Sequence, residues 1–337
     1  MAVATNPNRW KKRRELSAEP SHLARRGIPP RGEVIAPPLG QQVLQATLLE
    51  IFAHPTREHP WNPTGRTLTE LYLCYGSWVS PQPDRIIMGS TLAQRMASYL
   101  LPYVKNIDSD FPHCRGIPGL RYRRGARYGY ELVHLPTQTT IEIRDGNLGR
   151  NERLLDEAQC NRDDPGYIPL WQETDLTEVE RQWNNIWRPS NHTPLNSAWF
   201  NALRMLDTYP DGTRKSARDA VFQPAATDGT PAYLRWCGTL TPQDAVDNLT
   251  TLGVGAYGEP LTLSATAPGF AIATAGGVSI ELHQRPVCPG CRETQNKWHG
   301  STATRSRGPA NVGAPTTTTA PGPLRRPKND YTSAVSA

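Results

Sequence analysis

The sequence predicts an α+β fold, in which helices and short antiparallel hairpins lie between two disordered basic tails. Segments with apolar residues at helical spacing are interspersed with segments of two-residue periodicity. Both ends of the chain are rich in proline, arginine or threonine and poor in apolar residues, so neither can bury enough surface to fold. We therefore expect four regions. They are a disordered basic arm (1–38), an α+β region with a basic and aromatic hairpin (39–150), a helical pair followed by a β-hairpin and a candidate zinc site (167–300), and a disordered Thr/Pro/Arg tail (301–337).

Composition excludes two broad classes of protein. Only 37% of the 337 residues are hydrophobic, and 32 prolines and 27 glycines favour loops and tails over packed elements. No apolar stretch approaches the roughly 18 residues that cross a bilayer. The charged start of the chain is not followed by the apolar run of a secretory signal. We therefore expect neither a membrane-spanning protein nor a secreted disulfide scaffold.

The charge balance favours an anionic partner. Lysine and arginine number 37 against 31 acidic residues, for a net charge of +6, and only six of the basic residues are lysine. Arginine binds phosphate through two parallel hydrogen bonds and stacks on bases, which lysine does less well. The alternative explanation is codon bias in a GC-rich genome, which enriches arginine, alanine, glycine and proline together.

Five helices are expected from apolar stripes and capping residues. The first spans Gln41 to His54, and the second begins after a Ser90 cap. A helical pair occupies Thr177 to Leu206, where Thr177 and Glu180 have the spacing of a capping box. The last helix runs from Thr241 to Leu252.

Strands are expected where residues alternate between turn signals. One strand is expected at 68–75, and one hairpin joins 127–135 to 139–144. Strands at 261–266, 270–275 and 278–283 follow the last helix, and Gly276-Gly277 has the composition of a two-residue hairpin turn. No repeat of 20 to 50 residues is detectable.

A basic and aromatic segment at 115–130 is the first candidate binding site. Arginine neutralises phosphate, and tyrosine offers a face on which an unpaired base can stack. The alternative is a solvated turn whose tyrosines pack on the sheet. The residues predicted to contact nucleic acid are Arg115, Arg121, Tyr122, Arg123, Arg124, Arg127 and Tyr128.

A second candidate is the basic cluster Lys11, Lys12, Arg13 and Arg14. Four consecutive basic residues on an accessible arm have the form of a nuclear localisation signal or a nucleic-acid patch. The alternative is a solvated tail that no receptor binds.

A third candidate is a structural zinc site. Cys288 and Cys291 have Cys-x-x-Cys spacing, and His283 and His299 flank them. Two sulfurs and two imidazoles would complete a tetrahedral zinc site. The histidine spacing matches no standard zinc finger, so a reduced thiol pair or a redox pair is the alternative.

The sequence contains no phosphate-binding loop, nucleophile elbow or His-Glu-x-x-His motif. We therefore expect a non-enzymatic regulatory or accessory protein of viral type, present in nucleus and cytoplasm, that binds host proteins, nucleic acid or both. One alternative is a capsid-type protein whose basic arm neutralises packaged nucleic acid. Another is a metal-dependent enzyme that uses Cys288 and Cys291.

Overall fold

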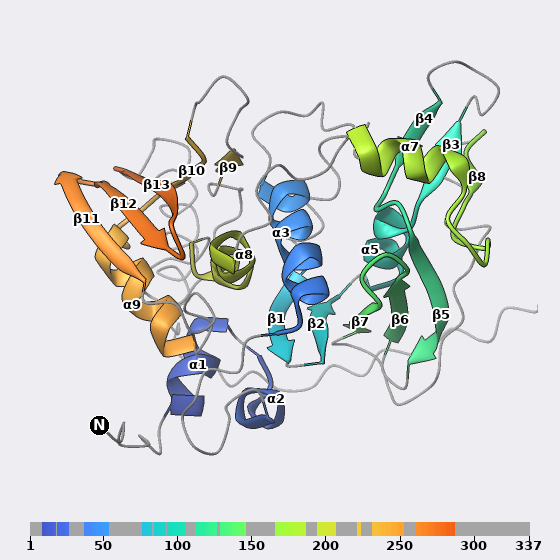
Figure 1. Ribbon diagram of the computed structural model, residues 1–337. Helices are drawn as coiled ribbons and strands as arrows, with labels where there is room; N and C mark the ends of the chain where they lie inside the picture. Colours follow the sequence, from blue (N-terminus) through green and yellow to red (C-terminus); the bar gives the residue numbers. More distant parts are fainter. Residues whose placement is uncertain are drawn as a thin grey trace, which may run out of the picture. The chain divides into compact units, whose positions relative to one another are not determined.

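The computed structural model confirms an α+β fold with helices and three β-sheets (Figure 1). All described residues belong to one compact unit, Met1–Asn296. The described residues are 9–17, 19–26, 37–53, 76–82, 84–91, 93–105, 112–126, 129–145, 166–186, 194–206, 221–223, 231–252 and 261–286.

The first sheet has five strands in the order β1-β2-β7-β6-β5. β2 and β7 are parallel, and the other neighbours are antiparallel. Helices α3 (Leu39–Ala53) and α5 (Ala93–Leu100) pack on this sheet. Its strands are β1 (Gly76–Gln82), β2 (Arg85–Ser90), β5 (Leu120–Ala126), β6 (Gly129–His134) and β7 (Thr139–Asp145).

The second sheet also has five strands, in the order β9-β10-β13-β12-β11. β10 and β13 are parallel, and the other neighbours are antiparallel. Helices α8 (Pro194–Leu206) and α9 (Pro242–Leu252) contact it. Its strands are β9 (Val221–Gln223), β10 (Tyr233–Cys237), β11 (Thr262–Ala267), β12 (Phe270–Ala275) and β13 (Val278–Arg285).

The two large sheets are two copies of one topology. Each copy runs helix, two strands, helix, three strands, and each places its fifth strand parallel to its second. The edge strands β5 and β11 are equivalent, and each carries one extra bulged residue, Arg123 in β5 and Thr266 in β11. We name these copies repeat 1 (α3 to β7) and repeat 2 (α8 to β13).

A third, small sheet combines an insertion in repeat 1, between α5 and β5, with a strand that follows β7. It consists of β3 (Tyr103–Lys105), β4 (His113–Arg115) and β8 (Ile168–Pro169), in the order β4-β3-β8. Helix α7 (Glu178–Ile186) follows β8 in the chain. This insertion distinguishes repeat 1 from repeat 2 in the part of the chain that the structure describes.

The first helices of the two repeats pack against each other. α3 also contacts β9, the first strand of repeat 2, and α8 contacts β1, the first strand of repeat 1. Gln45 Nε2 lies 3.5 Å from Asn201 Oδ1. The two residues hold equivalent positions, because Gln45 is seven residues after Pro38, which precedes α3, and Asn201 is seven residues after Pro194, which opens α8. Reciprocal contacts between equivalent elements are typical of a two-fold interface.

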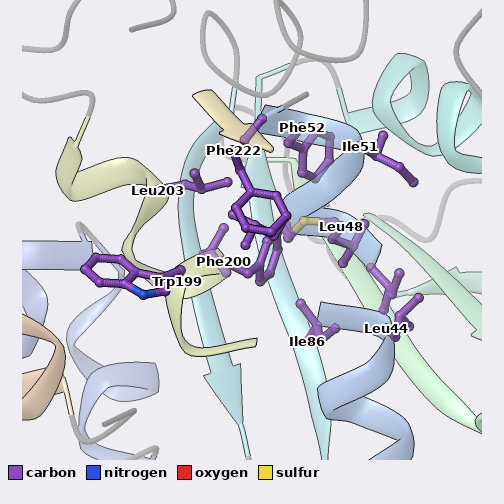
Figure 2. Packing of buried hydrophobic residues seen from close by; sticks show 14 of the residues in the cluster. Leu44, Leu48, Ile51, Phe52, Ile86, Trp199, Phe200, Leu203 and Phe222 are labelled. Atoms are coloured by element: carbon purple, nitrogen blue, oxygen red, sulfur yellow. The ribbon is translucent and has the colours of Figure 1, made fainter. Parts of the chain in front are cut away.

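Apolar side chains from both repeats fill this seam. The Phe52 and Phe200 rings stack with centroids 6.3 Å apart, and Trp199 is fully buried. The labelled side chains of α3, α8, β2 and β9 gather in one cluster (Figure 2). A single hydrophobic core therefore joins the two repeats.

Several predicted elements are confirmed. The helices at α3, α5, α7, α8 and α9 and the strands at β6, β7 and β11 to β13 match the expected segments. The Thr177–Glu180 capping box forms, and Gly276 and Gly277 both have positive φ, as a two-residue turn requires. The strand expected at 68–75 lies outside the described residues, as do Cys288, Cys291 and the segment 301–337.

Two short helices are described within the N-terminal arm. Helices α1 (Arg9–Ser17) and α2 (Ser21–Arg26) form within the segment expected to be disordered. Leu23 and Ala24 of α2 are buried, and α1 contacts α8, α9 and β1. Burial against the two repeats therefore stabilises α1 and α2, although their composition alone does not predict stable helices.

Candidate nucleic-acid interface

Helices α1 and α2 form a docked pair that bridges the two repeats. α1 contacts α8 and α9 of repeat 2 and also β1 of repeat 1, while α2 contacts β1. Arg13 and Ser17 of α1 are buried and lie four residues apart on one face of the helix, and Trp10 is half-buried. We call these two helices the basic helix pair.

A buried ion pair anchors the basic helix pair. Arg13 is 2% exposed and donates to the Glu19 carboxylate, which is 1% exposed. The same carboxylate accepts hydrogen bonds from the hydroxyls of Ser17 and Ser80, and Ser80 belongs to β1. A buried charge is stable only when it is paired and hydrogen-bonded, so this network fixes α1 against repeat 1.

Among the described side chains of the basic helix pair, four cations are exposed. They are Lys11, Arg14, Arg25 and Arg26. The Arg25 guanidinium lies 4.3 Å from the Trp10 ring centroid, and the Lys11 ammonium lies 5.9 Å from it. The indole thereby brings a cation of α1 beside one of α2, which is a cation–π arrangement.

Two acidic side chains accompany these cations. Glu15 is exposed on α1, and Asp84 Oδ2 lies 3.6 Å from Arg26 and 2.9 Å from Arg85. Burial raises the pKa of Asp84, but hydrogen bonds and charge from Arg85 and Arg26 outweigh it, so the pKa lies below the usual value. The surface nevertheless keeps an excess of positive charge.

The predicted nuclear localisation cluster is divided by this geometry. Lys11 and Arg14 point outward, whereas Arg13 is buried against Glu19. The side chain of Lys12 lies outside the description. The four basic residues therefore do not form one exposed run while α1 is docked.

In the second predicted site, the structure corrects the expectation for Arg121. Its guanidinium is buried and donates two hydrogen bonds of 2.7 Å to the Glu180 carboxylate. It also donates to the backbone carbonyls of Glu173 and Asp175. Arg121 therefore holds the loop before α7 on β5, and it cannot reach a phosphate while this ion pair is formed.

Arg115 is corrected in the same way. Its guanidinium lies between two tyrosine rings, 4.4 Å from the Tyr103 centroid and 4.6 Å from that of Tyr167. The residue is 5% exposed. This double cation–π contact ties β4 to β3 and to the segment before β8, so Arg115 is part of the small sheet's packing.

The remaining residues of that segment have mixed outcomes. Tyr122 is half-buried, with its ring edge-on to Trp171 at 6.2 Å. The Arg123 side chain is 62% exposed and lies 3.4 Å from Glu131. Arg127 and Tyr128 lie outside the described residues, and so does the side chain of Arg124. Among the predicted contact residues whose side chains the structure describes, Arg123 is the exposed one, and a phosphate can reach it.

A titratable network that the sequence did not indicate surrounds Glu180. The peptide unit between Pro118 and Gly119 donates its N–H to Glu180 at 2.7 Å and directs its carbonyl toward His134 Nε2 at 3.2 Å. Burial raises the pKa of Glu180, but hydrogen bonds from Arg121, Thr177 and Gly119 outweigh it and lower the pKa below its usual value. Burial lowers the pKa of His134 to about 4, so the imidazole is neutral near pH 7.

The candidate zinc ligands are only partly described. His283 lies on β13, where Nε2 is 2.9 Å from Glu281 Oε2, and its ring contacts Phe270 and Tyr233. Cys288, Cys291 and His299 lie outside the described residues. Among the described side chains, no group of three or more His, Cys, Asp or Glu residues could hold a metal ion. Zinc binding stays a prediction.

Comparisons with known proteins give no relative. No protein-family model, no curated protein and no solved structure matches the chain. Within the described ranges, no helix is long and apolar enough to cross a membrane.

We predict that Arg121→Met lowers the free energy of unfolding by about 3–5 kcal/mol, because it leaves the Glu180 charge buried and unpaired. Urea denaturation measures the loss. The control is Arg181→Met, which should change stability by no more than about 0.5 kcal/mol, because Arg181 and its ion-pair partner Glu178 are both exposed. Equal, small losses in the two variants would show that the Arg121–Glu180 pair is dispensable.

We predict that His134 makes the protein less stable as pH falls from 6.5 to about 4. In this range the imidazole of the unfolded chain takes up a proton, whereas the native imidazole, with its lowered pKa, stays neutral. The full effect is about 3 kcal/mol. Urea denaturation at several pH values should give a shallower slope for His134→Gln than for the parent. Parallel slopes would contradict the burial of a neutral His134.

Proposed function

We propose that the protein is a non-enzymatic nucleic-acid-binding accessory protein, and that the basic helix pair contacts the phosphate backbone. One observation carries this proposal. Arg13 of the basic helix pair is buried against Glu19, whereas Lys11, Arg14, Arg25 and Arg26 of the same pair are exposed. A folded surface with clustered cations is the electrostatic pattern expected of a phosphate-binding protein.

The chemistry of the exposed cations supports phosphate over other anions. Three of the four are arginines, whose planar guanidinium groups match the oxygens of a phosphate. Trp10 restricts Arg25 to one region of the surface, which reduces the entropy lost on binding. The net charge of +6 would accelerate encounter with any polyanion.

The surface contacts proposed here carry no base specificity. They are contacts from cations to phosphates, which fix the position of a nucleic acid and do not distinguish sequences. Regulation by partner proteins, nuclear entry and a viral origin remain part of the hypothesis from the sequence. The described sheets do not favour the capsid-type alternative. A capsid jelly roll is built from antiparallel strands, whereas each of the two large sheets contains a parallel strand pair.

We predict that replacing Lys11, Arg14, Arg25 and Arg26 together by glutamine weakens binding to nucleic acid and flattens its salt dependence. Each lost contact lowers the slope of log K against log salt by about 0.9 for duplex DNA and about 0.7 for a single strand. Fluorescence anisotropy with labelled duplex and single-stranded oligonucleotides at several salt concentrations measures both quantities.

The control removes the same charge elsewhere. Replacing the exposed residues Arg95, Lys105, Arg181 and Arg285 by glutamine gives an equal net charge. This control should keep the parental slope, because the long-range field changes while the contacts stay. Equal slopes for the parent and both variants would overturn the proposal that the basic helix pair is the phosphate-binding surface.

A further inference from the structure

The β11–β12 hairpin is exposed and yet carries no charge. Residues 261–280 contain no Asp, Glu, Lys, Arg or His, in a chain of which 20% is charged. Every residue from Ser264 to Ala267 is exposed, and so is Thr262. A solvent-exposed edge strand normally carries charges that prevent pairing with another chain, so this hairpin is unusual.

β11 is the outer strand of the second sheet and pairs with β12. Its residues Thr262 to Ala265 keep regular register with β12, and the bulge at Thr266 comes only near the end of the strand. One side of this regular segment is paired to β12. No described strand pairs with its other side, whose backbone donors and acceptors can pair with a further strand.

The other edges in the described part of the chain are protected. β5, the equivalent strand of repeat 1, carries Arg121, Arg123 and Arg124. β1 contains Pro81 and is contacted by α2. β4, β8 and β9 have three residues or fewer. β11 has six residues with neither charge nor proline.

We propose that β11 pairs antiparallel with β11 of a second copy of this chain, so that two five-stranded sheets become one ten-stranded sheet. Across a two-fold axis a strand faces itself, and any charge on it would face a like charge. A strand composed of Thr, Leu, Ser and Ala avoids this repulsion. Since each copy carries a net charge of +6, two copies approach most favourably where neither is charged.

The neutral edge also argues against nucleic acid as its occupant. Phosphate binding requires cations, and residues 261–280 supply none. A strand from a different protein is the other possible occupant. It would leave the purified chain monomeric, so the oligomeric state separates the two.

Sedimentation equilibrium of the purified full chain, without nucleic acid, tests the proposal. The mass should rise with concentration from 37.4 kDa toward twice that value. The variant Ser264→Lys/Ala265→Lys should remain at the monomer mass, because it places four like charges in the two-fold interface. Both positions are exposed, and thermal melting followed by circular dichroism checks that the variant is folded.

The matched control is Ser279→Lys, which adds a lysine at an exposed position on the central strand β13 of the same sheet. This control should associate as the parent does. A mass of 37.4 kDa at every concentration would overturn the proposal. A dimer that persists in the double-lysine variant would overturn it as well, because the contact would then lie elsewhere.

Discussion

The ion pair between Arg13 and Glu19 is the interaction on which the functional surface depends. Without a partner, a buried guanidinium would destabilise α1 by several kcal/mol, and the helix would not dock. With Glu19 bound also by Ser17 and Ser80, the charge is neutralised within the protein and α1 is held on β1. Lys11, Arg14, Arg25 and Arg26 of the docked basic helix pair are then exposed.

The two repeats give this surface a rigid support. Because α3 and α8 pack reciprocally and share one core, α1 can contact repeat 1 and repeat 2 at once. The equivalent edge strands of the repeats differ in charge. In β5, Arg123 is exposed at the bulge and Arg121 is buried against Glu180, whereas β11 contains no charged residue. One topology therefore supplies a charged edge and a neutral edge.

Much of the fold followed from local patterns. The Thr177–Glu180 box and the Gly276-Gly277 turn are set by residues close in sequence, and both form as predicted. The repeat was not visible in the sequence, because it lies in the order and pairing of the strands. β1 and β2 were missed because they are buried or covered, so their residues need not alternate in polarity.

The candidate sites were predicted less well, for a physical reason. Composition shows that arginines are clustered, but not which of them have partners distant in sequence. Arg121 pairs with Glu180 and Arg115 contacts Tyr167, each more than fifty residues away in sequence, so these predicted phosphate ligands are structural residues.

Hydrogen exchange of the full chain tests the central claim most directly. The account predicts that α1 amides exchange at least about ten-fold slower than in an unstructured peptide, and that Glu19→Gln abolishes this protection. Unprotected α1 amides in the parent protein would contradict the docking of the basic helix pair.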